Sequence, residues 1–163
     1  MTFTIDTPEI VDAPEMPWVG VRHRVTMQQM DQPAQSFATV AAWIAEHGAT
    51  SEGPPFYKYE VIDMEAELTV VAGFAVDEPQ QPDDTVFVGT LPAGRYLTVT
   101  HVGHPQDLVE VTRQLLEYAA SNGLTFDCTP DQREWAARLE FYVSDESADM
   151  TTWETELAFK LAD

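Results

Sequence analysis

Apolar and polar residues alternate in several short stretches of this chain, and a period of two is typical of half-buried strands. The stretches with this pattern are 19–25, 56–62 and 67–76, followed by 95–102, 138–144 and 153–161. Turn-forming Gly and Pro residues separate most of them, for example at 53–55 and 92–94. We therefore predict strands at these positions, with a further short apolar stretch at 86–88 opening the second half.

Two other stretches carry apolar residues at the spacing of one helix face. In the range 36–48 these residues are Phe37, Val40, Ala41 and Ile44, and in 105–122 they are Leu108, Val111, Leu115 and Tyr118. Glycines at 48 and 123 provide stop signals. The predicted order is strand, helix, strand, strand, and then the same order again.

The two halves also resemble each other in sequence. Residues 43–48 and 118–123 each combine an aromatic residue, a short helix end and a glycine. Such self-similarity indicates duplication. We predict an α+β fold of tandem βαββ repeats with pseudo-twofold symmetry, in one domain over 1–163, with repeats at about 10–80 and 84–163. Antiparallel sheets would carry the helices on one face, with a central ligand cleft between the halves.

Charge narrows the choice of partners. The chain has 8 Lys and Arg against 28 Asp and Glu, a formal net charge of −20. Nucleic-acid affinity depends on basic side chains that neutralise phosphates, so we expect no nucleic-acid partner. The plain interpretation is solubility. The alternative is attraction for a cationic ligand or a basic protein.

Location is predicted from features the sequence lacks. Cys128 is the only cysteine, which excludes an intrachain disulfide and fits a reducing compartment. The first residues do not form a signal peptide, and no apolar stretch approaches the length of a membrane span. We expect a cytoplasmic protein with no membrane partner.

Four segments, taken in order, resemble the GyrI-like small-molecule-binding family, which also supplies the effector-binding domain of some AraC-type and MerR-type regulators. They are 53–59 (GPPFYKY), 91–96 (LPAGRY) running into 101–103 (HVG), 139–145 (LEFYVSD) and 153–157 (WETEL). Each segment alone is weakly specific, but together with the element order they cover nearly the whole chain. The family fold is a tandem pair of strand-helix-strand-strand units, as the pattern predicts.

The resemblance implies a pocket for lipophilic, often cationic aromatic compounds, as in multidrug or effector binding. A buried glutamate is a family hallmark, and it maps best onto Glu140. The chain has no room for the DNA-binding domain of the regulators, so the resemblance implies a stand-alone member. Some stand-alone members inhibit DNA gyrase, and others hydrolyse cyclopropane-bearing electrophiles.

Alternation places Glu140 and Tyr142 on one face of their strand and Leu139, Phe141 and Val143 on the other. We expect the second group to face the helices and Glu140 to face the concave side. There its carboxylate could pair with a ligand cation or act as a general base, with Tyr142 assisting. Strand patterning alone favours a solvated glutamate, because charged residues are rarely buried.

Aromatic side chains can stack on a ligand and attract cations. The predicted ligand-binding residues are Glu140, Tyr142, Tyr57, Tyr59, Phe56, Trp135, Trp153 and His101, with Trp135 at the pocket rim. Trp43 is assigned to core packing instead. His101 and His104 lie close in sequence, but His23, His47 and Cys128 are scattered, and a zinc site needs at least three protein ligands. We predict no metal and no cofactor.

Three functions remain open at this point. The first is a binding module for hydrophobic small molecules with Glu140 as the electrostatic anchor. The second is a hydrolase in which Glu140 activates water against an electrophilic ligand. The third is a protein-interaction module that inhibits gyrase, or that acts with a partner regulator. The first two need the same carboxylate and aromatic residues, so the sequence does not separate them.

Overall fold

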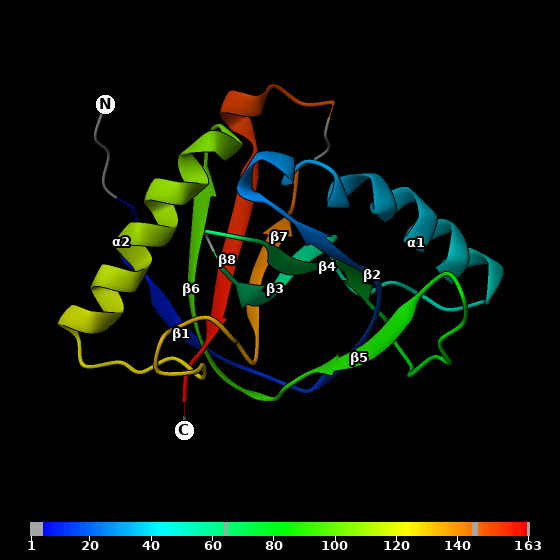
Figure 1. The fold of residues 1–163 in the computed structure, drawn as a ribbon, viewed down its shortest axis with the longest axis horizontal. Helices are drawn as coiled ribbons and strands as arrows, with labels where there is room; N and C mark the ends of the chain where they lie inside the picture. The colour runs from blue at the N-terminus through cyan, green and yellow to red at the C-terminus, as the bar shows by residue number, and fades with distance from the viewer. Residues whose placement is uncertain (1–4, 64, 145–146, 163) are drawn as a thin grey trace.

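The computed structural model describes residues 5–63, 65–144 and 147–162, and in these ranges it consists of an eight-stranded sheet and two α-helices (Figure 1). The strands are β1 (Glu9–Ala13), β2 (Met16–Val25), β3 (Phe56–Ile62), β4 (Leu68–Ala75), β5 (Phe87–Leu91), β6 (Gly94–Val102), β7 (Arg138–Tyr142) and β8 (Glu154–Lys160). The α-helices are α1 (Ser36–Glu46) and α2 (Leu108–Ser121), and short 3₁₀ turns lie at Met27–Gln29, Pro33–Gln35, Pro105–Asp107 and Met150–Thr152. The first four residues, used above to argue location, and Asp145 of the third family segment lie outside the described residues.

The sheet is antiparallel throughout and has the strand order β1-β6-β8-β7-β3-β4-β2-β5. The first repeat is β2-α1-β3-β4 and the second is β6-α2-β7-β8, so the predicted βαββ tandem is confirmed. Read outward from the central pair, β7-β8-β6-β1 mirrors β3-β4-β2-β5. The two units therefore join through β3 and β7, and Glu140 lies on one of these two central strands.

The edge strands β1 and β5 extend the predicted pattern. The sequence analysis did not predict β1, and it indicated only the first residues of β5. Both are five residues long, and β1 has no buried residue while β5 has one, Leu91, so the apolar alternation that marks the other strands is weak in them. β1 pairs with β6 of the second unit, and β5 pairs with β2 of the first.

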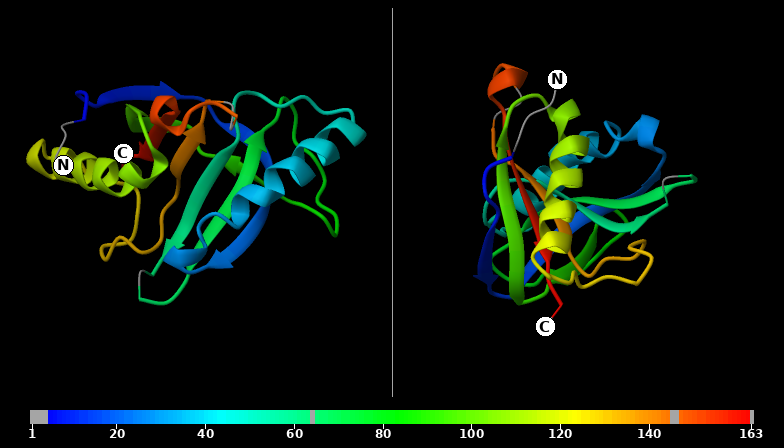
Figure 2. Two further views of the ribbon diagram at one scale, coloured as in Figure 1. Left: turned by 90° about the horizontal axis from the view of Figure 1, so that it is seen from above. Right: turned by 90° about the vertical axis from the view of Figure 1, so that its left-hand side faces the viewer.

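Both helices pack on the face of the sheet that carries Glu140. Leu115 of α2 belongs to the same buried cluster as Leu157 of β8, and Leu157 lies directly opposite Glu140 in the β7–β8 ladder. On the other side, Phe37 of α1 stacks on Tyr57, which is opposite Glu140 in the β3–β7 ladder. Figure 2 shows α1 along the strands of the first unit and α2 beside those of the second.

The prediction that Leu139, Phe141 and Val143 face the helices is therefore wrong. Leu139 and Phe141 point to the opposite face, where the curled sheet encloses a second core with Phe56 and Trp18. Val143 is exposed. Alternation separates the two faces of a strand, but it does not say which face the helices cover when both faces are buried.

The ends of the two helices confirm the internal repeat. Gly48 and Gly123 both follow the helix C-cap by one residue, and both have φ of +69°. Glycine adopts this left-handed conformation without the steric cost that a side chain brings. No helix in the described part of the chain is long and apolar enough to cross a membrane.

Candidate functional site

Glu140 lies at the centre of the sheet and is almost completely buried, with 7% of its surface exposed. Its neighbours across the ladders are Tyr57 on β3 and Leu157 on β8. Two hydroxyl groups donate hydrogen bonds to its Oε1 atom, from Tyr59 at 3.0 Å and from Tyr142 at 2.7 Å. The structure thus holds a carboxylate in the interior with tyrosine hydroxyls as its partners.

Burial raises the pKa of Glu140, because a desolvated carboxylate is less stable than the neutral acid. The hydrogen bonds from the two tyrosines and the charge of Arg138 act in the opposite direction and only partly offset that effect. Burial and the nearby carboxylate also raise the pKa of Tyr59 and of Tyr142 well above the ordinary value, so both hydroxyls keep their protons. Perturbed pKa values cluster at functional sites, so the raised pKa makes Glu140 a candidate functional residue.

Aromatic rings enclose this carboxylate. The aromatic cluster, by which we mean Phe37, Tyr57, Tyr59 and Tyr142, joins α1 to β3 and β7. Tyr57 and Tyr142 meet edge to face with ring centroids 5.1 Å apart, and Phe37 stacks on Tyr57 at 5.6 Å. Aromatic faces carry negative potential, so an aromatic-lined carboxylate suits a cation.

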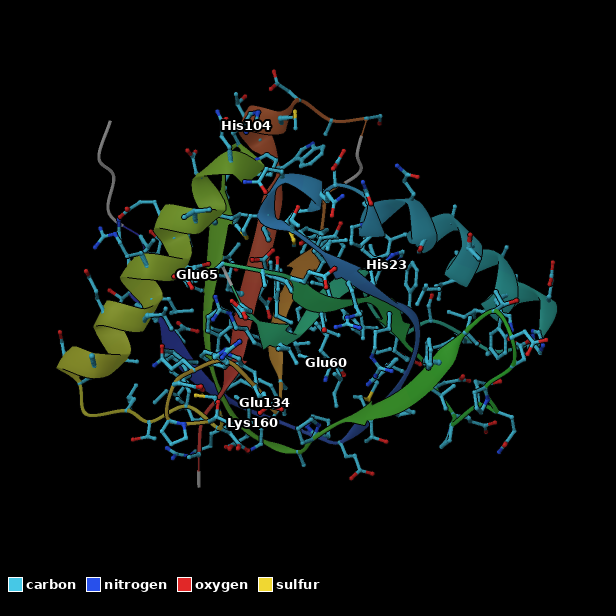
Figure 3. All side chains as sticks on the ribbon, viewed as in Figure 1. His23, Glu60, Glu65, His104, Glu134 and Lys160 are labelled. Carbon is cyan, nitrogen blue, oxygen red and sulfur yellow. The ribbon has the colours of Figure 1, made fainter. Side chains whose placement is uncertain are left out.

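A covering segment, residues 26–35, closes over the aromatic cluster. It consists of the two short turns before α1, and Met27 and Met30 pack against the cluster's core. The Tyr57 hydroxyl donates to the Met30 carbonyl oxygen at 2.9 Å. At the end of the segment, a ring nitrogen of His23 (Figure 3) lies 2.7 Å from the Ser36 hydroxyl oxygen. Glu140 lines neither of two grooves at the surface, and with 7% of its surface exposed its side chain is closed off from solvent in this structure.

Arg138 lies two residues before Glu140 on the same face of β7. Its guanidinium carbon is 4.7 Å from the Trp135 ring centroid, 4.8 Å from that of Phe159 and 5.9 Å from that of Tyr59. Burial lowers the pKa of Arg138. Its Nε atom is buried, and no described residue accepts a hydrogen bond from it. Arg138 also lines one of the surface grooves, which has a volume of about 550 Å³.

The structure brings three predicted ligand-binding residues, Tyr57, Tyr59 and Tyr142, into contact with Glu140 or with one another around it. It does not bring Phe56 to them. Phe56 is fully buried on the opposite face, where it pairs with Phe141 across the ladder. Phe56 therefore packs in the core that the curled sheet encloses.

The other predicted residues also lie away from Glu140. Trp135 is buried among Phe126, Phe159 and Arg138, and it forms core rather than a rim. Trp153 donates its indole N–H to the Ala148 carbonyl oxygen, at the turn before β8. His101 shares the face of Tyr142 but lies two strands away, 3.8 Å from Asp107. In the described ranges no three His, Cys, Asp or Glu side chains form a group that could hold a metal ion.

Sequence reasoning missed Phe37 and Met30, and it gave Arg138 no role. Phe37 was assigned only to a helix face, and the loop position of Met30 carries no pattern. A signal for Arg138 did exist, because alternation places residues 138, 140 and 142 on one face. The pattern therefore places a second charge, that of Arg138, on the face of Glu140.

Comparison with solved structures shows that this chain has a known fold. The C-terminal domain of EcmrR superposes with a TM-score of 0.78 at 17% identity, covering 96% of this chain and 98% of that one. A protein named SAV2435, solved bound to tetraphenylphosphonium, gives 0.60 at 12% identity, covering 96% and 94%. A protein described as a hydrolase from Listeria innocua gives 0.63 at 18% identity, covering 98% and 94%. At such identities these likenesses show the fold alone.

EcmrR in a complex with DNA is a longer protein. It superposes with a TM-score of 0.80 at 18% identity, and this chain covers 57% of its length. Comparison with curated protein sequences gives no significant match. The family model described as the GyrI-like small molecule binding domain, in contrast, matches residues 6–162. The chain therefore belongs to the GyrI-like family of small-molecule-binding domains.

Proposed function

We propose that this chain binds lipophilic, often cationic aromatic compounds, with Glu140 as the electrostatic anchor of the site. The observation that carries the proposal is the buried carboxylate beneath the aromatic cluster. An ionised carboxylate in the interior is costly without a charged or hydrogen-bonding partner. Here its partners are two neutral hydroxyls on one oxygen atom. A ligand cation would supply the opposite charge.

Binding requires the closed site to open. The covering segment is attached to the cluster by methionine packing and by the hydrogen bond from Tyr57 to Met30. Methionine side chains are flexible and adapt to different neighbours. We infer that a ligand displaces Met27 and Met30, stacks on the rings of the aromatic cluster and places its cation near Glu140. Such a pocket would accept compounds of varied shape, as multidrug binding requires.

Two comparisons support this assignment. The SAV2435 structure holds a lipophilic cation, tetraphenylphosphonium, in a protein of the same fold. The EcmrR C-terminal domain is the same fold within a longer protein that binds DNA. For this chain we propose a cytoplasmic binder that does not itself contact nucleic acid, and whose protein partner, if it has one, is a regulator or gyrase.

A fluorescence titration with a cationic rhodamine ethyl ester tests the proposal. Exchange of Glu140 for Gln keeps the size of the side chain and removes its charge. The variant is expected to bind the dye about 10- to 100-fold more weakly, the scale of a charge-assisted hydrogen bond. Glu154→Gln is the matched control, because Glu154 is an exposed glutamate on the neighbouring strand β8. Equal affinity of the Glu140 variant and the parent would refute the anchor role.

The same geometry favours a second candidate, hydrolysis of an electrophilic or cyclopropane-bearing compound. The raised pKa of Glu140 would make its carboxylate a stronger base toward an attacking water, and the Tyr142 hydroxyl would hold that carboxylate in place by its hydrogen bond. A protein described as a hydrolase has this fold. Mass spectrometry after incubation with such a compound would show a product of added water, which Glu140→Gln should abolish. If the protein only binds the compound, mass spectrometry should show the compound unchanged after incubation.

A further inference from the structure

Two opposite charges share the buried face of β7 without pairing. Arg138 and Glu140 are two residues apart on one strand, which separates their Cβ atoms by about 7 Å. No ion pair or hydrogen bond joins them in the described structure: Glu140 accepts from Tyr59 and Tyr142, and the Nε atom of Arg138 has no acceptor. A buried donor without an acceptor costs free energy comparable to a lost hydrogen bond.

Tyr59 connects the two charges. Its ring lies 5.9 Å from the guanidinium carbon of Arg138, while its hydroxyl donates to Glu140. The rings of Trp135 and Phe159 hold the guanidinium from other sides, so its position is fixed by packing. Arg138 and Glu140 therefore form a pre-arranged pair of charges with an aromatic ring between them.

Arg138 also opens onto the groove of about 550 Å³, so a ligand can reach this side of the site from the surface. The groove runs between Leu116 of α2 and the end of β3 at Ile62. Two carboxylates at the groove are already engaged: Asp63 pairs with Arg133, and Asp131 accepts from the Thr129 hydroxyl. Glu65, labelled in Figure 3, also lines the groove and is exposed.

We propose that the ligands of this site are amphoteric aromatic compounds, whose carboxylate or other anionic acceptor meets Arg138 while their cationic group meets Glu140. This inference rests on the proposed function and narrows its ligand class. A purely cationic ligand near Glu140 would be opposed by the positive charge of Arg138 on the same face of β7. A ligand with both charges instead gives the Arg138 Nε an acceptor and Glu140 a counter-charge. Arg138 is then a specificity-determining residue.

A matched pair of dyes tests this inference. The rhodamine ethyl ester is a cation, and the corresponding free acid has the same ring system with a free carboxylate in place of the ester group. Binding should be measured at physiological salt, where the Debye length of about 8 Å screens the long-range pull of the net charge of −20 on the cationic ester. The parent protein is expected to bind the free acid about tenfold more tightly than the ester, through a charge-assisted hydrogen bond to Arg138.

Variants of Arg138 then test whether this residue causes the preference for the free acid over the ester. Arg138→Met keeps a long side chain for the three rings and removes the charge, so it should weaken free-acid binding about 10- to 100-fold and bind the ester at least as tightly as the parent. Arg138→Lys keeps the charge without the planar fork, so it should retain part of the preference. Circular dichroism establishes that each variant is folded. If Arg138→Met does not fold, the role of Arg138 is tested by comparing the preference for the free acid over the ester in Arg138→Lys and in the parent protein.

The outcomes separate this inference from the proposed function. A parent protein that binds the ester as tightly as the acid, or an Arg138→Met change that weakens both dyes equally, overturns the role of Arg138. In that case a loss of both dyes on Glu140→Gln would leave the proposed function standing. If Glu140→Gln changes the binding of neither dye, or if the parent binds neither dye, both proposals fail.

Discussion

Exchange of Glu140 for Gln is expected to stabilise the fold at neutral pH, although it weakens ligand binding. Burial raises the pKa of Glu140 above the ordinary value of 4.5, so between that pH and the folded-state pKa the native protein holds more protons than the unfolded chain. The free energy of unfolding must then fall as pH rises through this window. Glutamine carries no proton to lose, so its variant avoids this loss.

The size of the effect follows from two opposing contributions. Desolvation of an ion costs several kcal/mol in real proteins, and replacing Glu140 removes that cost. The same exchange weakens two hydrogen bonds from tyrosine, each by about 1 kcal/mol, because an acceptor amide oxygen replaces a carboxylate. The attraction of Arg138 is lost as well. We expect a net gain of about 1 to 2 kcal/mol at neutral pH, which shrinks toward zero or reverses below pH 4.5.

Urea unfolding of the parent and the variant across pH 4 to 8 measures this difference at about 0.5 kcal/mol precision. Glu154→Gln is again the control, and as a surface exchange it should stay within about 0.5 kcal/mol of the parent. A Glu140→Gln variant that is less stable than the parent at neutral pH would refute the reasoning. So would a stability difference that does not change with pH.

Three further results are expected. Tyr59→Phe and Tyr142→Phe each remove a hydrogen-bond donor to Glu140, so urea unfolding should show a loss of stability of about 1.5 to 3 kcal/mol at neutral pH. The loss should be smaller once Glu140 is protonated. The control Tyr96→Phe removes a hydrogen bond to the Pro92 carbonyl oxygen, so its loss of stability should be the same at every pH. Leu139→Ala should cost about 2 to 5 kcal/mol of stability yet leave dye affinity unchanged in the folded protein, because Leu139 packs on the face opposite the site; a large loss of affinity would contradict that placement. A fluorescent DNA duplex should show no saturable binding near physiological salt, since the net charge of −20 leaves few phosphate contacts possible.

Local patterns were enough to predict most of the fold. The periods of two and 3.6 located the strands of both βαββ units and the two helices, because burial of one face imposes those periods on the sequence. The face of the sheet that the helices cover was harder to predict. Leu139 and Glu140 were assigned to opposite faces correctly, but the helices lie on the face of Glu140. Both faces of the central strands are buried, so apolar content does not identify the helix side.

The site could be predicted only in part for a similar reason. Tyr142 was predicted because alternation places it on the face of Glu140, and Tyr57 and Tyr59 were predicted because their aromatic rings can stack on a ligand. Phe56 is adjacent in sequence to Tyr57 but points the other way, as strand geometry requires. Contacts from the covering segment and from Phe37 depend on tertiary packing, which no local period encodes.

The most direct test of the central claim is a crystal structure of the protein with the rhodamine ethyl ester or its free acid. The account predicts density for the dye between the rings of the aromatic cluster, with a cationic nitrogen near the Glu140 carboxylate. The covering segment should be displaced, and the hydrogen bond from Tyr57 to Met30 should be broken. Density for the dye only in a surface groove, with Tyr59 and Tyr142 still closed over Glu140, would contradict it.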